Sequence, residues 1–138
     1  MTSATLVPQP KGPYATTRRV GDVLYLSGQG SIDVTTGEPV LDDIRSQTRR
    51  TLENIEALLE SEGFELGDLA QITCYLTDMD EWPAMNEAYA AYLTNRAKPV
   101  RTAVQVSRLP FGISLEMACV AHRERATGDA APAGAASA

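Results

Sequence analysis

Apolar and β-branched residues gather in five short segments that are separated by turn residues, a pattern that predicts β-strands. The segments are residues 15–20, 23–29, 70–76, 102–108 and 114–123. Gly21-Asp22 separates the first two segments, and such a pair is a hairpin signal. We therefore expect the folded part of the chain to open with a β-hairpin.

A longer segment, residues 42–62, repeats its apolar residues with the period of a helix. Asp42 or Asp43 is a suitable N-cap for this helix, and Gly63 is a suitable stop at its C-terminus. The residues expected on its inner face are Ile44, Thr48, Leu52, Ile55 and Leu59. The first predicted helix therefore lies between the second and third strands.

A second helix is predicted from a cap at Asp78 or Asp80 to about Asn95, with Pro83 tolerated in its first turn. Its apolar stripe is Trp82, Met85, Tyr89, Tyr92 and Leu93. Stripes of this kind are usually part of a core, so we expect the aromatic residues to pack inside the domain.

The order β-β-α-β-α-β-β indicates an α+β fold, in which a mixed sheet carries both helices on one face. In the last strand, alternate residues point to opposite faces of the sheet. One set is Leu115, Met117, Cys119 and Ala121, and the other is Glu116, Ala118 and Val120. Both sets are largely apolar, and the helices can cover only one face. We therefore expect another subunit to cover the second face, with active sites between subunits.

The two ends of the chain differ in composition from its middle. Residues 1–12 are rich in Pro and Thr, and we expect a flexible N-terminal arm. Residues 126–138, ATGDAAPAGAASA, offer no large side chain to bury, so a disordered tail is expected there. One folded domain is therefore expected over residues 13–125.

The charge of the chain disfavours several classes of partner. Its formal net charge is −6 and it has no basic stripe, so binding to the phosphates of a nucleic acid is not expected. No apolar run approaches the roughly 20 residues of a membrane span. The N-terminus lacks the basic and apolar order of a signal peptide. We therefore expect a cytoplasmic protein that binds neither nucleic acid nor membrane.

Cysteine and histidine give no sign of a metal site. Cys74 and Cys119 each lie within an apolar segment, as buried and reduced cysteines do. His122, the only histidine, has no Cys or His at ligand spacing and is expected at the end of the last strand. No metal is therefore predicted.

Two charged residues stand out because apolar neighbours surround them in predicted strands. Glu116 shares its side of the last strand with Ala118 and Val120, so its carboxylate needs a partner or takes a raised pKa. Arg101 opens a strand after Pro99-Val100, where a guanidinium can bind a carboxylate through two hydrogen bonds. Taken alone, a residue of either kind is more often part of an ordinary salt bridge, and Glu116 could also be exposed at a strand end. The two would approach each other if their strands were adjacent and antiparallel.

Two further short patterns are compatible with a small-molecule pocket. Ser27-Gly28 near the end of the second strand offers a hydroxyl and a backbone that a ligand can approach closely. Tyr14 offers a phenol that could either pack or line a pocket. With a single histidine, the chain holds no convincing Ser-His-Asp or Cys-His arrangement.

Taken together and in order, six short motifs resemble the Rid (reactive intermediate deaminase) family, also called YjgF-like. They are Gly12-Pro13-Tyr14, Leu26-Ser27-Gly28-Gln29, QTRRTLEN from Gln47 to Asn54, Pro99-Val100-Arg101-Thr102, Arg108-Leu109-Pro110 and Leu115-Glu116-Met117. The resemblance extends from Gly12 to Val120, which is almost the whole predicted domain. It implies a chorismate-mutase-like fold and a homotrimer.

The resemblance also implies an activity. Rid proteins hydrolyse reactive enamines and imines such as 2-aminoacrylate and 2-iminopropionate to a 2-keto acid and ammonia, without a cofactor. By this resemblance Arg101 binds the substrate carboxylate and Glu116 acts on the water, while Tyr14, Ser27 and Gly28 contact the substrate.

The chain departs from the family pattern at positions near a substrate side chain. Ala103 stands where many deaminating members have Cys or Ser, Ile32-Asp33 replaces an apolar-Pro pair, and Phe111-Gly112 replaces a more polar turn. The identity of the substrate is therefore open. Alternatives are a specialised enzyme for a larger enamine, or a regulator that binds a carboxylate without turnover. A ribonuclease, as some members have been described, is disfavoured by the net charge of −6.

Overall fold

The computed structural model describes residues 6–124 and contains the predicted elements in the predicted order. The five strands are β1 (Thr17–Val20), β2 (Val23–Gly30), β3 (Leu69–Leu76), β4 (Val100–Gln105) and β5 (Leu115–His122). The two helices are α1 (Ile44–Ser61) and α2 (Trp82–Tyr92). One boundary differs by three residues: the fourth strand ends at Gln105 instead of Arg108. Its only neighbour, β3, ends at the paired residue Leu76, so the chain beyond has no strand to join.

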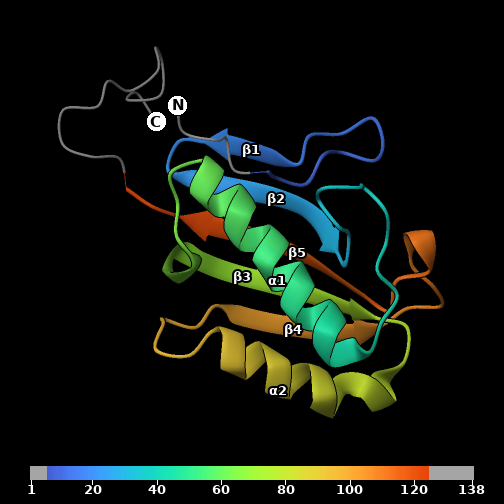
Figure 1. The fold of residues 1–138 in the computed structure, drawn as a ribbon. Coiled ribbons are helices and arrows are strands. Elements are labelled where there is room, and N and C mark those ends of the chain that lie inside the picture. The colour runs from blue at the N-terminus through green and yellow to red at the C-terminus, as the bar shows by residue number, and fades with distance from the viewer. Residues whose placement is uncertain (1–5, 125–138) are drawn as a thin grey trace.

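The five strands form one mixed sheet with the spatial order β1-β2-β5-β3-β4 (Figure 1). β3 and β4 run parallel and are connected through α2, whereas the other neighbouring pairs are antiparallel. The hairpin β1-β2 turns at Gly21, whose φ of 60° lies in the left-handed region that glycine enters without strain. The predicted α+β fold with a mixed sheet is confirmed.

Both helices pack on the same side of the sheet (Figure 1). α1 crosses the middle of the sheet, and α2 lies alongside β4 at its edge. Asp43 is the N-cap of α1, since its side chain accepts a hydrogen bond of 2.8 Å from the Ser46 N–H. The chain leaves α1 through Gly63, at φ 79°. Both signals were correctly identified from the sequence.

The second helix is shorter at both ends than its apolar pattern predicted. Asp78 caps a separate 3₁₀ turn, Met79–Glu81, and α2 begins only after it at Trp82. At the other end α2 stops at Tyr92, because the chain turns at Asn95 with a φ of 61°, outside the helical region.

The core lies between the helices and the sheet. On β5 the set Leu115, Met117, Cys119 and Ala121 is buried, as the period of two predicted. Both cysteines are free and buried. The aromatic stripe of α2 is only partly core: Met85, Tyr89 and Leu93 are buried, but Trp82 remains 41% exposed. The expectation that the whole stripe packs inside was wrong for Trp82, which lies at the first turn beyond the sheet edge.

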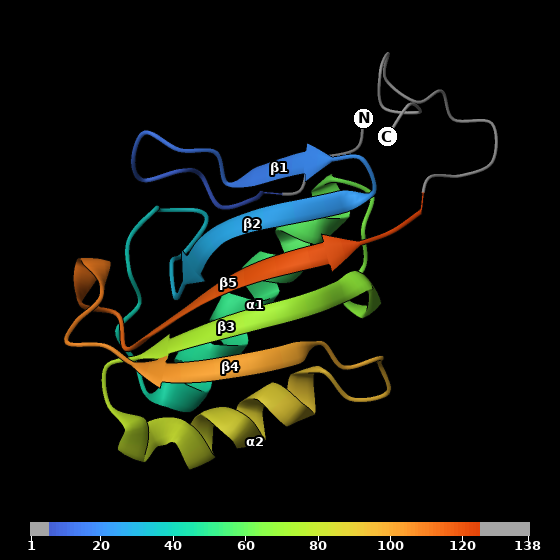
Figure 2. The same ribbon diagram turned by 180° about the vertical axis from the view of Figure 1, so that it is seen from behind.

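No helix covers the opposite face of the sheet (Figure 2). Tyr25, Val100 and Val104 lie on this face and are 49%, 70% and 39% exposed. Exposed apolar side chains on one continuous surface are typical of a protein interface. The second face is therefore bare in a single copy of the chain.

The ends of the chain are described only in part. Of the expected arm 1–12, residues 1–5 lie outside the described residues; within the rest, Pro8 is buried and Val7 packs against the core. The expected tail 126–138 lies outside the described residues. Within residues 6–124, no helix is long and apolar enough to cross a membrane.

Two buried amides of α1 hold the loops at one end of the sheet. Asn54 donates hydrogen bonds to the carbonyls of Gly30 (3.2 Å) and Ile32 (2.9 Å). Gln47 accepts a hydrogen bond of 2.9 Å from the Ser114 N–H, just before β5. Both amides belong to the motif QTRRTLEN, so the structure gives this motif a physical role: it fixes the ends of β2 and β5 relative to each other.

Asn54→Ala is expected to lower the free energy of unfolding by about 1–3 kcal/mol, because it removes the donor that satisfies two carbonyls in a buried place. Urea unfolding monitored by circular dichroism measures this change. Glu60→Ala, on the exposed side of the same helix, should change the value by less than about 0.5 kcal/mol. Equal effects of the two substitutions would contradict the role assigned to Asn54.

Candidate active site

A pocket opens where the end of β2, the N-terminal segment and the turn before β5 meet. Three of the predicted site residues, Tyr14, Gly28 and Glu116, line it together. The rest of its wall is part apolar and part polar: it includes Pro8, Ile32, Pro110, Phe111 and Ile113 together with Gln9, Lys11, Thr16 and Gln29. A partly buried carboxylate in a pocket that combines apolar and polar walls is a common setting of a binding or catalytic site.

The pocket depends on the missing side chain of Gly28. A Cβ atom at this position would lie 2.5 Å from Oε2 of Glu116 and 2.6 Å from its Cδ, closer than atoms can approach. The strand pairing of β2 with β5 shifts register between Leu26 and Gln29, so a bulge brings the Gly28 backbone against the carboxylate. The neighbour of Gly28 in this structure is thus Glu116, and the expected approach of a substrate to the Gly28 backbone stays a prediction.

Partial burial makes Glu116 a candidate for proton transfer. Desolvation in the pocket raises the pKa of the Glu116 carboxyl above its ordinary value. No described residue forms an ion pair with it that would counteract this shift. A carboxyl with a raised pKa takes up and releases protons closer to neutral pH than a free one.

Tyr14 and Ser27 occupy different positions relative to the pocket. The Tyr14 side chain is half exposed at the rim, and its hydroxyl accepts a hydrogen bond of 3.3 Å from the Lys11 N–H. Ser27 is not part of the pocket lining, and its hydroxyl donates to the Thr16 carbonyl at 3.3 Å. The predicted contact of Ser27 with a substrate therefore stays a prediction, whereas Tyr14 lies where a ligand can reach it.

Arg101 lies on the helix side of β4, against the aromatic residues of α2. Its guanidinium carbon is 4.8 Å from the centre of the Tyr89 ring and 5.9 Å from that of Trp82. Such stacking favours a cation and holds the flat guanidinium in one plane. Among the described residues no carboxylate forms an ion pair with Arg101, so its hydrogen-bond donors are free for an anion.

Arg101 and Glu116 do not meet within one copy of the chain. The strands that carry them are not neighbours, because β3 lies between β4 and β5. Arg101 is paired with Ile72 of β3 and Glu116 with Tyr75, three residues further along, so their side chains point to opposite faces. The condition under which the two residues would approach each other, adjacent antiparallel strands, is not met.

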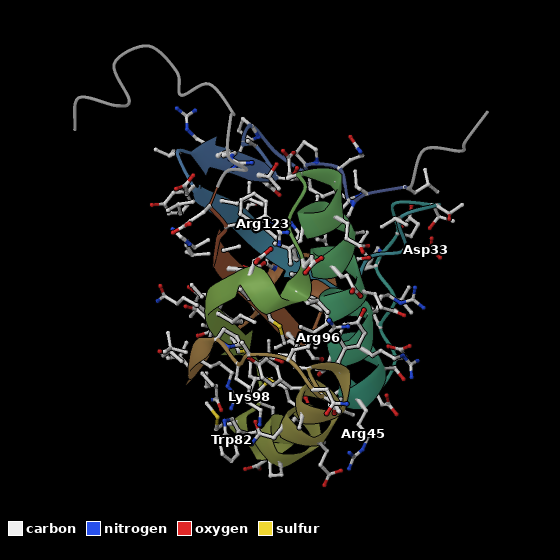
Figure 3. All side chains as sticks on the ribbon, turned by 90° about the vertical axis from the view of Figure 1, so that its left-hand side faces the viewer. Asp33, Arg45, Trp82, Arg96, Lys98 and Arg123 are labelled. Carbon is white, nitrogen blue, oxygen red and sulfur yellow. The ribbon has the colours of Figure 1, made fainter. Side chains whose placement is uncertain are left out.

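The surroundings of the two residues also lie apart. Trp82, which stacks with Arg101, lies at the α2 end, whereas Asp33, next to the pocket residue Ile32, lies toward the β1 end (Figure 3). Within one copy the sheet therefore separates Arg101 from the pocket of Glu116.

Several pocket residues were not singled out from the sequence as contacts. Ile32 and Phe111 were noted only as departures from a pattern, and Ile113 and Lys11 were not noted at all. The loops that carry them have no periodicity from which their direction could be predicted. His122 is exposed at the end of β5, as expected. Within the described residues no group of His, Cys, Asp or Glu is arranged to hold a metal ion.

A family model described as endoribonuclease L-PSP matches residues 4–123, nearly the whole chain. The chain belongs to the Rid, or YjgF-like, family. This Rid protein is 46% identical over 117 residues to a RutC family protein of Pyrococcus horikoshii. The aligned region covers 85% of this chain and 92% of that protein. The chain is 34% identical over 118 residues to a protein of Salmonella typhimurium named 2-iminobutanoate/2-iminopropanoate deaminase, covering 84% and 91%.

Solved structures agree with the fold of this Rid protein. Escherichia coli TdcF with bound serine superimposes with a TM-score of 0.82 at 32% identity, covering 86% of this chain and 94% of that chain. The YjgF gene product of Escherichia coli gives the same TM-score and coverage at 31% identity. The arrangement of two helices on a mixed five-stranded sheet is therefore that of the family.

The raised pKa of Glu116 predicts a pH dependence of stability. The folded state holds the proton of this carboxyl to higher pH than the unfolded state, whose pKa is about 4.3. Folding therefore favours the protonated form, and this contribution to stability is lost as the pH rises above about 4.3. We expect Glu116→Gln to reduce this loss.

Thermal unfolding midpoints of the wild type and Glu116→Gln between about pH 4 and pH 7 test this prediction. The gap between the two proteins should widen in favour of the variant as the pH rises. Parallel curves would show that the pKa of Glu116 is the same in the folded and unfolded states.

Proposed function

We propose that this Rid protein is a hydrolytic deaminase of 2-imino acids and their enamine tautomers, of the 2-iminopropionate type. The observation that carries the proposal is the Glu116 carboxylate, packed against Gly28 in a pocket that raises its pKa. The unpaired guanidinium of Arg101 supplies a site for the substrate carboxylate. The relative in Salmonella typhimurium whose name states this activity supports the same conclusion.

To catalyse imine hydrolysis, the protein has to orient the substrate and the water and to transfer protons. The imine carbon is already electrophilic, so the reaction starts when Glu116 takes a proton from a bound water and the water oxygen bonds to this carbon. The electrons of the C=N bond move to nitrogen, which takes the proton back from Glu116. Glu116 then passes the hydroxyl proton of the tetrahedral intermediate to the same nitrogen, the C–N bond breaks with its electrons on nitrogen, and ammonia and a 2-keto acid are released. Orientation of the reactants alone can lower the barrier by about 7 kcal/mol or more.

The proposed site combines residues of two copies. Arg101 of one copy would bind the carboxylate of the substrate, and Glu116, Gly28 and Tyr14 of another would surround its imine carbon. The bare sheet face, on which Tyr25, Val100 and Val104 are exposed, supports such an assembly, because burial of its apolar surface would stabilise it. We propose the homotrimer that the family resemblance implies.

Arg101→Ala is expected to lower kcat/KM for 2-iminopropionate by at least about 100-fold, since the substrate loses its charge-assisted anchor. Arg101→Lys should recover only part of the rate, because an ammonium cannot form the paired hydrogen bonds of a guanidinium. Loss of the imine, generated in the assay by an amino acid oxidase, is followed directly. Full activity of Arg101→Ala would refute the mechanism, and no acceleration by the wild type would refute the proposed function.

A mixing experiment tests whether the site is shared between copies. Arg101→Ala and Glu116→Gln, each inactive alone, are mixed in equal amounts, unfolded and refolded together. Random assembly should restore about a quarter of the wild-type activity, because only that fraction of interfaces pairs an intact Arg101 with an intact Glu116. The separately refolded variants serve as the control. No recovery, in a mixture shown to have exchanged subunits, would place both residues in one copy.

A further inference from the structure

Phe111 adopts a backbone conformation that is costly for a large side chain. Its φ of 64° and ψ of 12° place it in the left-handed region, and Gly112 follows at φ 74°. Outside glycine this region is rare, and a bulky residue there usually marks a turn under constraint. Glycine or asparagine at position 111 would satisfy the same turn with less strain.

Burial of the Phe111 side chain does not offset the cost of this backbone conformation. The side chain is 51% exposed, so the core of the domain does not explain the aromatic ring. A residue in a strained conformation that contributes little to folding is a candidate for a functional role.

The position of Phe111 indicates what this role is. Phe111 lines the same pocket as Glu116 and Tyr14, together with Pro110, Ile32 and Ile113. The end of the Ile113 side chain lies against the Gly30 backbone, since a Cβ on Gly30 would lie 2.4 Å from its Cδ1 atom. One part of the pocket wall is therefore made of apolar side chains around one strained aromatic ring, while Gln9, Lys11 and Gln29 line another part.

We propose that Phe111 determines specificity and that the site prefers 2-imino acids with a large apolar or aromatic side chain over the methyl group of 2-iminopropionate. This inference rests on the proposed deaminase function and deepens it. With the substrate carboxylate on Arg101 of another copy and water on Glu116, the third substituent of the imine carbon would lie in the pocket that Phe111, Ile113 and Ile32 help to line. A ring stacked on Phe111 buries apolar surface that a methyl group cannot reach.

The test compares two imines that an amino acid oxidase generates, one from alanine and one from phenylalanine. The measured quantity is the ratio of kcat/KM for the phenylalanine-derived imine to kcat/KM for 2-iminopropionate. The wild type should have a ratio above one. Phe111→Gly and Phe111→Asn should lower the ratio about tenfold, whereas Phe111→Tyr should keep it.

The substitutions at position 111 are chosen so that a change in the ratio of kcat/KM values cannot result from a loss of folding. Glycine and asparagine both tolerate the φ of 64°, so neither variant should unfold at a lower temperature than the wild type. Val20→Thr removes an exposed apolar side chain from β1, outside the pocket, and should leave the ratio unchanged.

Three outcomes would overturn the inference, and they are distinguishable. If the wild type hydrolyses 2-iminopropionate but the Phe111 variants keep the wild-type ratio, the deaminase function stands and the specificity role of Phe111 falls. If the variants lose both activities equally and also change their molar mass in solution, Phe111 is an assembly contact. If the wild type hydrolyses neither imine, both the proposed function and the inference fall.

Discussion

In the sheet of this Rid protein β3 lies between β4 and β5, and the pleat turns the side chains of Arg101 and Glu116 to opposite faces. Neither residue can shift to the other face without a one-residue slip, which in β5 would expose the buried set Leu115, Met117, Cys119 and Ala121. The separation is thus enforced by the same packing that stabilises the domain. A substrate that needs both charges must be bound by more than one copy of the chain.

This constraint links assembly to chemistry. The uncovered face carries exposed apolar side chains, and Glu116 belongs to that side of the sheet. An isolated copy holds the Glu116 pocket without the Arg101 anchor, so imine hydrolysis would depend on oligomer formation. For a domain of this size, such association also buries surface that one core cannot cover.

Hydrogen bonds from α1 fix the conformation of the pocket. Asn54 and Gln47 hold the ends of β2 and β5, which carry Gly28 and Glu116. With these strand ends fixed, the surrounding structure can hold Phe111 at φ 64° in the turn before β5. The packed core thus stabilises a backbone conformation of Phe111 that this residue would rarely adopt in an isolated turn.

The sequence alone was sufficient for the local features. The periods of two and 3.6 residues predicted the strands, the helices and the two faces of β5. The helix cap at Asp43 and the turns at Gly21 and Gly63 were also predicted. All these signals depend only on residues that are neighbours in the sequence. The ordered motifs identified the family. The tertiary structure decided that β3 separates Arg101 from Glu116, that Trp82 stays exposed beside Arg101, and that Phe111 enters the pocket. Strand order and loop direction arise from contacts between residues distant in sequence, which no local pattern encodes.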